Sequence, residues 1–498
     1  MSGASVKKQK ILTTKSAVMY GVGILGVQLG IGLVNSYQAE FFNKILGANL
    51  MIVAAIILAA KFLSMAADFV IGNLIDRCHM KGGKIRPWLM ISAWPLTLMT
   101  MVSFIYVPFA SDAGRYVYIM FVTVLWNITM SLADIPSQGM LALLSPDGAE
   151  RNNAAGFANT LRNVSLGSSG VFATVICMMT GSGSLGRTEY LILAGVMCGI
   201  GLILYLLMYF FCRENVAASE SSAMSFKQMF LELKHNKMLI IVFLTFLLGF
   251  GRTIGLTIAV QASTILLREG VNLGPLGNFT GDGLSWLIAL TCAVSSMIVI
   301  VLMPVINKKW GEKKSFLVFG IYGFFVSVIS FCLYAFGGAP FRTLWAILIY
   351  QLLIGPAYGP NSFLPLVMVS DIVDYREWQS GKRTEGAQFA VLSLGNKIAY
   401  ALAISVGIFL VGAIGFSSEK YYAVRDSGEA ISNYVTNGMQ TSLWAIYFLI
   451  PGVCMLLSCI PMLWYKIDKA TKEKMRAELA ERRVAAEQAA CDKEFNAV

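Results

Sequence analysis

The fold of this chain is indicated first by the stretch 49–76, which reads NLMIVAAIILAAKFLSMAADFVIGNLID. Only three of its side chains are charged, and it is longer than the roughly 20 helical residues that cross the hydrocarbon core of a bilayer. The 498-residue chain repeats this character, with 56% hydrophobic and 13% charged residues, against about 25% charged residues in a typical soluble domain. Because lipid offers the backbone no hydrogen-bond partner, helix is the default spanning element. The sequence therefore predicts an all-α integral membrane protein.

Apolar stretches and the breaks between them predict twelve transmembrane helices. A polar connection over 213–237 divides them into two six-helix bundles, over 17–212 and 238–465, and two related halves are typical of alternating-access transporters. Segment 1–16 precedes the bundles, and segment 466–498 is a charged, Ala- and Glu-rich stretch that we expect to form a solvated helical tail. The predicted spans are 17–43, 49–76, 88–109, 114–144, 157–181, 189–212, 238–266, 283–306, 315–336, 343–369, 386–415 and 441–465.

Lysine and arginine are distributed unevenly between the two sets of connections. The N-terminus and the connections on its side carry 20 of them, whereas the opposite connections carry 7. Cytoplasmic connections are the ones enriched in Lys and Arg, so we expect a multi-pass protein of the inner or plasma membrane with both termini in the cytoplasm. The same bias accounts for the net charge of +11, and nucleic-acid binding is not needed to explain it.

Cysteine and histidine give little material for metal or covalent chemistry. Most of the nine cysteines stand singly within apolar stretches, and both histidines, His79 and His235, lie in charged connections. No metal-ligand spacing occurs, and the tail is too short for a signalling domain. We therefore expect no enzyme, no cofactor and no metal site. The expected partners are a small solute, a monovalent coupling cation and membrane lipid, and the expected state is a monomer.

Charged side chains inside the predicted spans are the candidate functional residues, because each costs about 2.5–3.5 kcal/mol there and normally faces a cavity or a partner. Two acids in the first half and a lysine in the second could form a network that a cation rearranges, or permanent ion pairs that tie helices together. Arg252 could bind a carboxylate or sulfonate of a solute through its guanidinium fork, or pair with an acid. The five residues are Lys61, Asp68, Asp134, Arg252 and Lys397.

Polar neighbours share helix faces with these charges. Residues spaced by three, four or seven positions lie on one face of a helix, and a proline inside a span loosens the turn that precedes it. Lys61 could also snorkel, or pair with the acid on its own face. The sets are Lys61, Ser64 and Asp68 on the second span, Ser131 and Asp134 before Pro136 on the fourth, and Ser393 and Lys397 on the eleventh.

A further group of residues lies at the predicted cytoplasmic ends of the helices. Its charges are expected to bridge helix ends and to hold an inner gate shut in one state, and the alternative is that they only set the topology. This group contains Asp76, Arg77, Gly83, Lys84, Arg86, Asp371 and Asp374.

Three blocks of sequence resemble one known family, the glycoside–pentoside–hexuronide:cation symporters. They occur in the family's order and lie in both halves, and with the span count the resemblance covers 17–465. It implies a major facilitator fold and uptake of a sugar or glycoside driven by Na⁺, H⁺ or Li⁺. The blocks are Asp68-Phe69-Val70-Ile71-Gly72 with Gly83-Lys84-Ile85-Arg86-Pro87-Trp88, then Asp134-Ile135-Pro136, then Asp371-Ile372-Val373-Asp374-Tyr375-Arg376-Glu377 followed by Lys397.

The resemblance also implies roles for particular residues. Asp68 matches an acid of the cation site on the second helix, and Asp134 matches an acid where the sugar and cation sites meet. Lys397 matches the lysine on the eleventh helix that couples the halves, with Ser393 at a neighbouring position.

The cation site departs from the family pattern in two places. The position of a second acid is Ser64 here, and an asparagine just before the retained acid is Ala67. Na⁺ is a hard cation that needs several oxygen ligands, whereas a single carboxylate can carry a proton. These departures favour H⁺ over Na⁺ as the coupling ion.

The sugar-facing positions have changed as well. Gln28 replaces an acid on the first helix, Gln138 replaces a tryptophan after Asp-Ile-Pro, and Ser362 lies where another tryptophan is expected. Either Asn159 or Arg162 corresponds to an arginine on the fifth helix. A galactoside is therefore not the expected substrate, and an anionic sugar such as a hexuronide or a sulfo-sugar is favoured. The alternative is an uncoupled facilitator or an exporter of a sugar-like or lipid-like solute.

Overall fold

The structure is a computed structural model, and it describes residues 13–481 apart from short gaps. Two compact units are present, each assembled from separate stretches of the chain. Unit 1 contains Met1–Ala223, Leu256–Leu290 and Ile404–Leu443, and unit 2 contains Met224–Gly255, Thr291–Ala403 and Trp444–Val498. The gaps are 78–79, 81–82, 84, 110, 146–147, 183, 216–232, 235, 269–270, 273–277, 280, 381–384, 468–469, 476 and 480.

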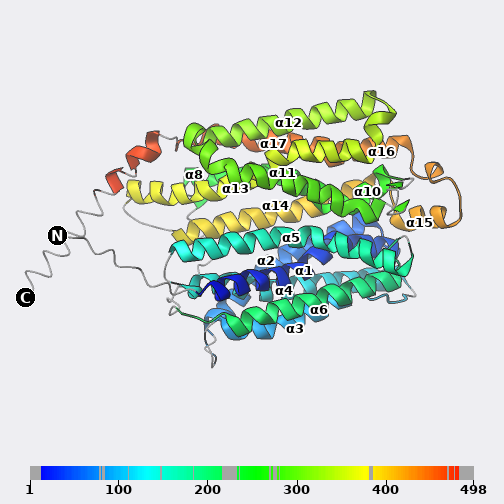
Figure 1. Ribbon diagram of the computed structural model, residues 1–498, viewed down its shortest axis with the longest axis horizontal. Coiled ribbons are helices and arrows are strands. Elements are labelled where there is room, and N and C mark those ends of the chain that lie inside the picture. Colours follow the sequence, from blue (N-terminus) through cyan, green and yellow to red (C-terminus); the bar gives the residue numbers. More distant parts are fainter. Residues whose placement is uncertain are drawn as a thin grey trace, which may run out of the picture. The chain divides into compact units, whose positions relative to one another are not determined.

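The first half of the chain forms six long helices that run side by side in unit 1 (Figure 1). All six lie at predicted spans, and the third differs at its end. It stops at Val102, seven residues before the predicted end at 109. Residues 105–109 are not helical, and Pro108 among them disfavours helical geometry at Val107. The six are α1 (Thr14–Lys44), α2 (Leu50–Arg77), α3 (Arg86–Val102), α4 (Asp112–Leu144), α5 (Gly148–Thr180) and α6 (Arg187–Phe211).

The seventh predicted span is broken. The chain runs through α8 (Lys237–Leu248), a 3₁₀ turn η1 (Phe250–Thr253), α9 (Ile254–Thr257) and α10 (Ala259–Leu266), and it bends by 43° at the first break. Gly249 and Gly251 flank that break, and glycine is poor at maintaining a helix. A Cβ on Gly251 would overlap the Cys454 sulfur, so close packing also requires glycine there.

The remaining five spans follow in order, with smaller elements between them. Nine helices among the described residues are long and apolar enough to cross a membrane, and the bent seventh span raises the number to ten. The elements are α11 (Gly281–Trp310), α12 (Glu312–Phe336), η3 (Ala339–Arg342), α13 (Leu344–Ser380), α14 (Glu385–Ala413), α15 (Ser418–Asp426), η4 (Ile431–Asn433), α16 (Asn437–Trp444), the π-helical η5 (Ala445–Leu449) and α17 (Ile450–Met462), with a short hairpin of β1 (Val271–Asn272) and β2 (Asn278–Phe279) before α11.

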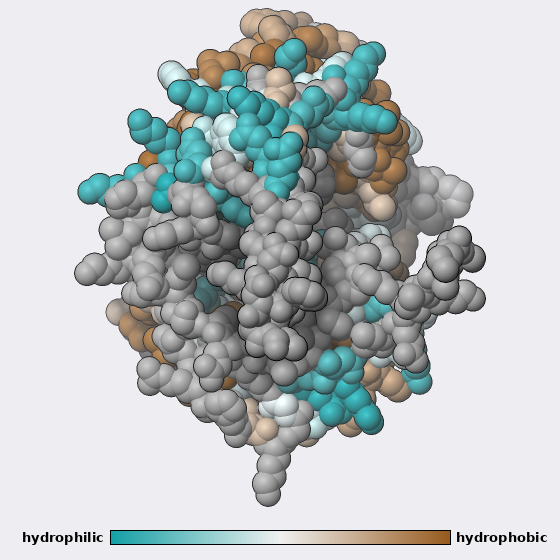
Figure 2. All heavy atoms as spheres, turned by 90° about the vertical axis from the view of Figure 1, so that its left-hand side faces the viewer, coloured by the Kyte–Doolittle hydropathy of each residue, from teal (hydrophilic) through white to brown (hydrophobic). Residues whose placement is uncertain are grey.

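The ends and the sides of these helices differ in polarity. Figure 2 looks onto the left side of Figure 1, and most described residues near the upper part of this face are hydrophilic, with hydrophobic ones toward its edges. Large hydrophobic side chains are exposed along the helix flanks, for example Val301 and Val305 on α11 and Phe325 on α12. Apolar flanks and polar ends suit helices that cross a bilayer.

Helix α1 is largely enclosed within unit 1, because small residues let its neighbours approach. A Cβ on Gly26 would lie 2.6 Å from both the Gly201 carbonyl oxygen and the Tyr205 nitrogen of α6. Small residues at such crossings are the usual means of close helix packing in membranes.

The start of α3 is held by a side chain from far along the chain. The Glu214 carboxylate accepts hydrogen bonds from the backbone N–H groups of Ile85 and Arg86, both at 2.8 Å. Gly83, just before them, has φ +126°, and a Cβ there would lie 2.5 Å from the same carboxylate. An acid at a helix N-terminus satisfies free N–H groups and complements the helix dipole.

We predict that Glu214→Ala destabilises the protein, because two N–H groups at the start of α3 lose their acceptor. Loss of such a cap costs about 0.5–2 kcal/mol, so the unfolding temperature in detergent should fall by a few degrees. Arg213→Ala is the matched control, since Arg213 is exposed beside it. Equal unfolding temperatures for the two variants would contradict the capping role.

Candidate functional site

A stripe of polar residues runs along the buried side of α4. Thr123, Asn127 and Ser131 are each at most 3% exposed, and Asp134 follows one turn later. The Asn127 amide nitrogen donates to the Thr123 carbonyl at 2.8 Å, while its oxygen has no hydrogen-bond partner among the described residues. Thr123 and Asn127 were not among the predicted site residues, although they precede Ser131 at four-residue intervals, which place them on the same helix face.

Two of the contacts of Asp134 are with Gln138 and Arg162 of unit 1. The Gln138 side-chain amide donates to one carboxylate oxygen at 2.6 Å, and the Arg162 guanidinium lies 3.8 Å from the other. A separation of 3.8 Å is a charge contact and is too long for a hydrogen bond. Position 138, where the resemblance places a sugar-stacking tryptophan, therefore holds an amide bound to the acid.

Arg162 is the residue of α5 that faces this acid. Its side chain is 34% exposed, and its Nε is buried without a hydrogen-bond partner among the described residues. Asn159, the other candidate for this role, is exposed one turn earlier. Of the two, Arg162 is the one in contact with Asp134, and its Nε–H has no acceptor among the described residues.

The second-span set lies on α2 as expected. Lys61 is 9% exposed, and its ammonium lies 5.5 Å from the ring centre of Trp126, within cation–π range. The Ser64 hydroxyl donates to the Lys61 carbonyl at 2.8 Å. Asp68 is half-buried further along the same face. The Trp126 indole is itself fixed by a 3.0 Å hydrogen bond to Thr100.

Gln28 and Gln261 are two of the buried glutamines of unit 1. Gln28 lies on the enclosed face of α1 and is 9% exposed. Gln261 on α10 is 2% exposed, and its side-chain oxygen has no hydrogen-bond partner among the described residues. Gln261 was not among the predicted site residues, because an uncharged amide in an apolar span is only a weak indication of a functional site.

Unit 2 contains the buried Arg252. Its guanidinium donates to the Asn361 carbonyl at 3.0 Å and lies 5.1 Å from the Phe246 ring centre. The side-chain oxygen of Asn361 has no hydrogen-bond partner among the described residues. Neither of these two contacts of Arg252, with a carbonyl and with an aromatic ring, is with an acidic side chain.

The other candidates of the second half lie on α14 and α13. Ser393 and Lys397 are both exposed on α14. The side chain of Ser362 on α13 lies outside the described part of the structure. The Asp371 carboxylate is 4% exposed, and Asp374 is half-buried one turn later.

The first-half gate candidates are only partly described. The side chains of Asp76 and Arg77, and the whole of Lys84, lie outside the described part of the chain. The Arg86 guanidinium donates to the Tyr209 carbonyl at 3.0 Å and lies 4.9 Å from the Tyr209 ring centre. Arg86 therefore connects α3 to α6 within the first half.

Helix α15 joins the two halves of the sequence inside unit 1. The Ser418 N–H donates to the Asn43 side chain on α1 at 2.6 Å, and both residues are buried. The Lys44 ammonium lies 3.2 Å from the ring centre of Tyr422. The end of α1 is therefore covered by a helix from the connection between the last two spans.

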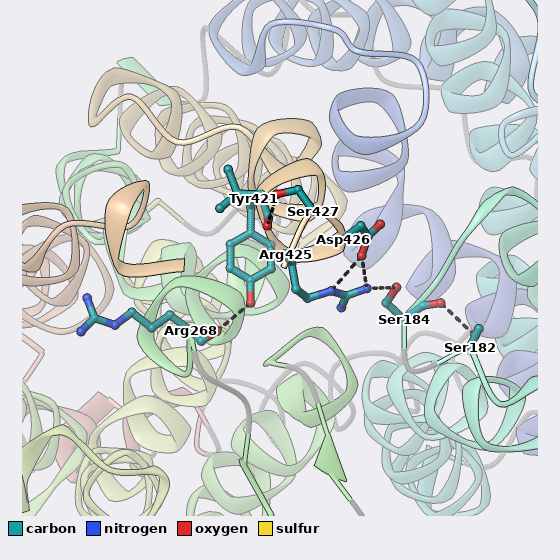
Figure 3. Close-up of polar contacts among 8 residues, drawn as sticks. Ser182, Ser184, Arg268, Tyr421, Arg425, Asp426 and Ser427 are labelled. Carbon is teal, nitrogen blue, oxygen red and sulfur yellow. Dashed lines mark hydrogen bonds and ion pairs between the residues drawn. The ribbon is translucent and has the colours of Figure 1, made fainter. Parts of the chain in front are cut away.

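Arg425 extends this junction to the connection between α5 and α6. Its guanidinium donates to the Ser184 hydroxyl at 3.1 Å and also contacts its neighbour Asp426 at 3.1 Å (Figure 3). Tyr421, one turn earlier, donates to the Arg268 carbonyl at 2.9 Å (Figure 3). Helix α15 therefore contacts the end of α1, the connection between α5 and α6, and the segment that follows α10.

Two close helix crossings accompany this junction. A Cβ on Gly170 of α5 would overlap the Trp286 side chain of α11 and lie 3.1 Å from its Cα. A Cβ on Gly412 of α14 would lie 3.2 Å from the Met51 nitrogen on α2. Both crossings join a first-half helix to a second-half helix within unit 1.

Comparison with known proteins agrees with the fold and the blocks described above. The family described as MFS/sugar transport protein matches residues 19–469. The chain is 22% identical to the isoprimeverose transporter of Lactiplantibacillus pentosus over 96% of this chain and 94% of that one. It is 23% identical to the glucuronide carrier protein homolog of Escherichia coli over 93% and 94% of the two chains. It is 25% identical to a putative 2,3-dihydroxypropane-1-sulfonate exporter of Salmonella typhimurium over 94% and 95%.

A solved structure gives the same fold. The partially occluded, inward-open xylose transporter XylE from E. coli superimposes with a TM-score of 0.57 at 13% identity, covering 91% of this chain and 98% of that one. The resemblance found in the sequence and its implied fold are thus confirmed. The chain is a multi-pass membrane protein with the major facilitator fold, and it belongs to the MFS/sugar transport protein family.

Proposed function

We propose that this protein imports an anionic sugar or glycoside, such as a hexuronide or a sulfo-sugar, together with a proton. The observation that carries the proposal is Arg162, whose buried Nε has no partner among the described residues and whose ion pair with Asp134 is 3.8 Å long. A guanidinium with unused donors beside a polar stripe is suited to bind a carboxylate or sulfonate.

The buried Arg252 supports the same class of solute. Its contacts are the Asn361 carbonyl and the Phe246 ring, so its charge can attract an anion. Among relatives, the names of a glucuronide carrier homolog and a sulfonate exporter also point to anionic cargo. Within this proposal, Gln28 and Gln138 hydrogen-bond sugar hydroxyls, and Asn127 and Gln261 provide further amide oxygens.

Asp68 is our candidate for the proton carrier. Around it, Ser64 directs its hydroxyl hydrogen to the Lys61 carbonyl, and the Lys61 ammonium lies on the same helix face. This face offers few oxygens and brings a positive charge, which disfavours Na⁺ and still permits protonation of a carboxylate. Asp134 and Lys397 then link cation and solute, with Ser131 and Ser393 as neighbouring polar groups.

The junction at α15 supports alternating access. It ties α1 to a second-half element through buried contacts, and the positive-inside rule places it on the outer side of the membrane. Import requires these contacts to open to the outside and to close again. The localisation that follows is the inner or plasma membrane, with both termini in the cytoplasm.

A second candidate is export or uncoupled passage of a small anionic solute on the same fold. The 25% identical relative named as a sulfonate exporter favours it. The direction of proton movement separates the two candidates, because an importer coupled to protons acidifies the compartment that receives the solute.

The decisive experiment is solute-driven proton and sodium movement in proteoliposomes, using acidic and neutral sugars with wild type and Asp68→Asn. We predict that an acidic sugar draws protons with it and that Asp68→Asn abolishes proton movement, because the amide cannot carry a proton at this position. Solute passage that continues equally in both proteins without ion movement would identify a facilitator. Sodium movement in place of proton movement would overturn the choice of ion.

Arg162 provides the test of substrate class. Hydrogen bonds to charged groups contribute about 1.5–3 kcal/mol, and each 1.4 kcal/mol is about tenfold in affinity. Arg162→Gln should therefore weaken binding of an anionic sugar about 10- to 100-fold and change binding of a neutral sugar much less, as measured by calorimetry. The control is Asn159→Ala, which lies exposed on the same helix. Equal losses for both kinds of sugar would contradict an anion-binding role.

Gly170 provides the test of whether the junction at α15 must close during transport. A leucine there should force α5 away from Trp286 and hold the junction open, so that net uptake falls at least tenfold while labelling of cysteines placed near Asn43 increases. Gly167→Leu is the matched control, because a Cβ on Gly167 meets nothing within 4 Å. Similar uptake by both variants would show that this crossing need not stay close during transport.

A further inference from the structure

The described start of the C-terminal tail is packed against unit 2. Residues 470–475, 477–479 and 481 are helical, and Met475 and Leu479 are 0% and 5% exposed. Lys472, Met475 and Leu479 are spaced at i, i+3 and i+7, so they lie on one face of this helix. This segment therefore differs from the solvated appendage that its composition predicted. The red ribbon at the upper left of Figure 1 is this helix, which we name the tail helix (470–481).

Lys472 connects the tail helix to two other helices at once. Its ammonium lies 2.7 Å from a Glu312 carboxylate oxygen on α12 and 2.8 Å from an Asp371 oxygen on α13. The side chains of Lys472, Glu312 and Asp371 are only 13%, 19% and 6% exposed. Short, charge-assisted hydrogen bonds of this kind are among the stronger polar contacts, and removing the lysine would leave two poorly solvated carboxylates.

A second contact holds the other end of the tail helix. The Trp378 indole of α13 donates to the Glu478 carboxylate at 2.6 Å. Asp371 and Trp378 are seven residues apart on α13, and Lys472 and Glu478 are six apart on the tail helix. The two helices are thus joined at two points along the last turns of α13.

The chain leading to the tail helix is also anchored. The Lys313 ammonium donates to the Leu463 and Tyr465 carbonyls at 2.9 and 2.7 Å, just after α17 ends. Burial, together with the negative charges of Asp371 and Glu312, raises the pKa of the Tyr465 phenol well above its usual value. Tyr465 therefore stays neutral, and it donates to the Met368 carbonyl at 3.4 Å.

We propose that the tail helix controls movement of the end of α13, and we call it the strap in that role. The ion pairs of Lys472 with Asp371 and Glu312, which we call the clasp, hold the strap in place. The inference rests on the proposed transport function, because Asp371 belongs to the block assigned to the inner gate. While Lys472 holds Asp371 and Glu312, that gate carboxylate is engaged inside the second half. Release of the strap frees Asp371 for the rearrangement of the gate that each transport cycle requires.

The test compares Lys472→Gln with Lys474→Gln in the full-length protein. Lys474 is exposed on the same helix, so its variant has the same change of charge without loss of the clasp. Hydrogen exchange of residues 470–481 is measured first, and it needs no substrate. We expect Lys472→Gln to lower protection of this segment at least tenfold and Lys474→Gln to leave it unchanged. Unchanged protection in Lys472→Gln would overturn the clasp.

Transport is measured second, as exchange of labelled solute across proteoliposomes. The strap predicts at least a threefold faster exchange in Lys472→Gln, and the same direction of change in Trp378→Phe, which removes the contact with Glu478 and leaves Lys472 intact. If protection falls and the exchange rate is unchanged or lower, the tail helix is a static anchor and the proposal is wrong. If wild type transports no tested solute while protection responds as expected, the proposed function fails and the docking of the tail helix stands.

Discussion

A polar group without a partner is far more costly in hydrocarbon than in water, and this constraint orders the whole molecule. It explains why the exposed flanks carry residues such as Val301, Val305 and Phe325. It also explains why α1 keeps its buried polar residues on enclosed faces, where Asn43 serves as acceptor for the start of α15. The buried charge of Arg252 is stabilised in part by the Asn361 carbonyl and the Phe246 ring.

The same constraint determines how much could be predicted from the sequence. Length and apolarity identify most membrane spans, and all twelve predicted spans coincide with helical segments of the described chain. The break in the seventh span was not predicted, because two glycines weaken a helix without requiring it to end, and the contact of Gly251 with Cys454 is visible only in the folded chain. The choice between Asn159 and Arg162 also required structure, since one helical turn separates them and both are polar.

The least predictable features depend on contacts between distant parts of the chain. Asn43 and Ser418 are 375 residues apart. The local sequence around either residue does not indicate that the two form a hydrogen bond. The Ala- and Glu-rich composition of the tail helix does not distinguish a solvated helix from one that packs on the rest of the protein. The stripe of Lys472, Met475 and Leu479 was readable in the sequence, but the two carboxylates that it meets come from helices whose ends converge only after folding.

The geometry around Asp134 bears on whether this acid is a permanent structural partner or part of a working site. A structural ion pair between a carboxylate and an arginine in membrane surroundings would be expected to form close, bidentate hydrogen bonds. Here Gln138, a neutral group on the same helix, donates to the carboxylate at 2.6 Å, and Arg162 remains at 3.8 Å, its Nε without a hydrogen-bond partner in the described part of the chain. Gln138 thus stabilises the Asp134 carboxylate, and the Arg162 guanidinium is not bound to it at hydrogen-bonding distance. Such an arrangement costs stability, and the cost is understandable if a bound anion completes the coordination of Arg162 during each transport cycle.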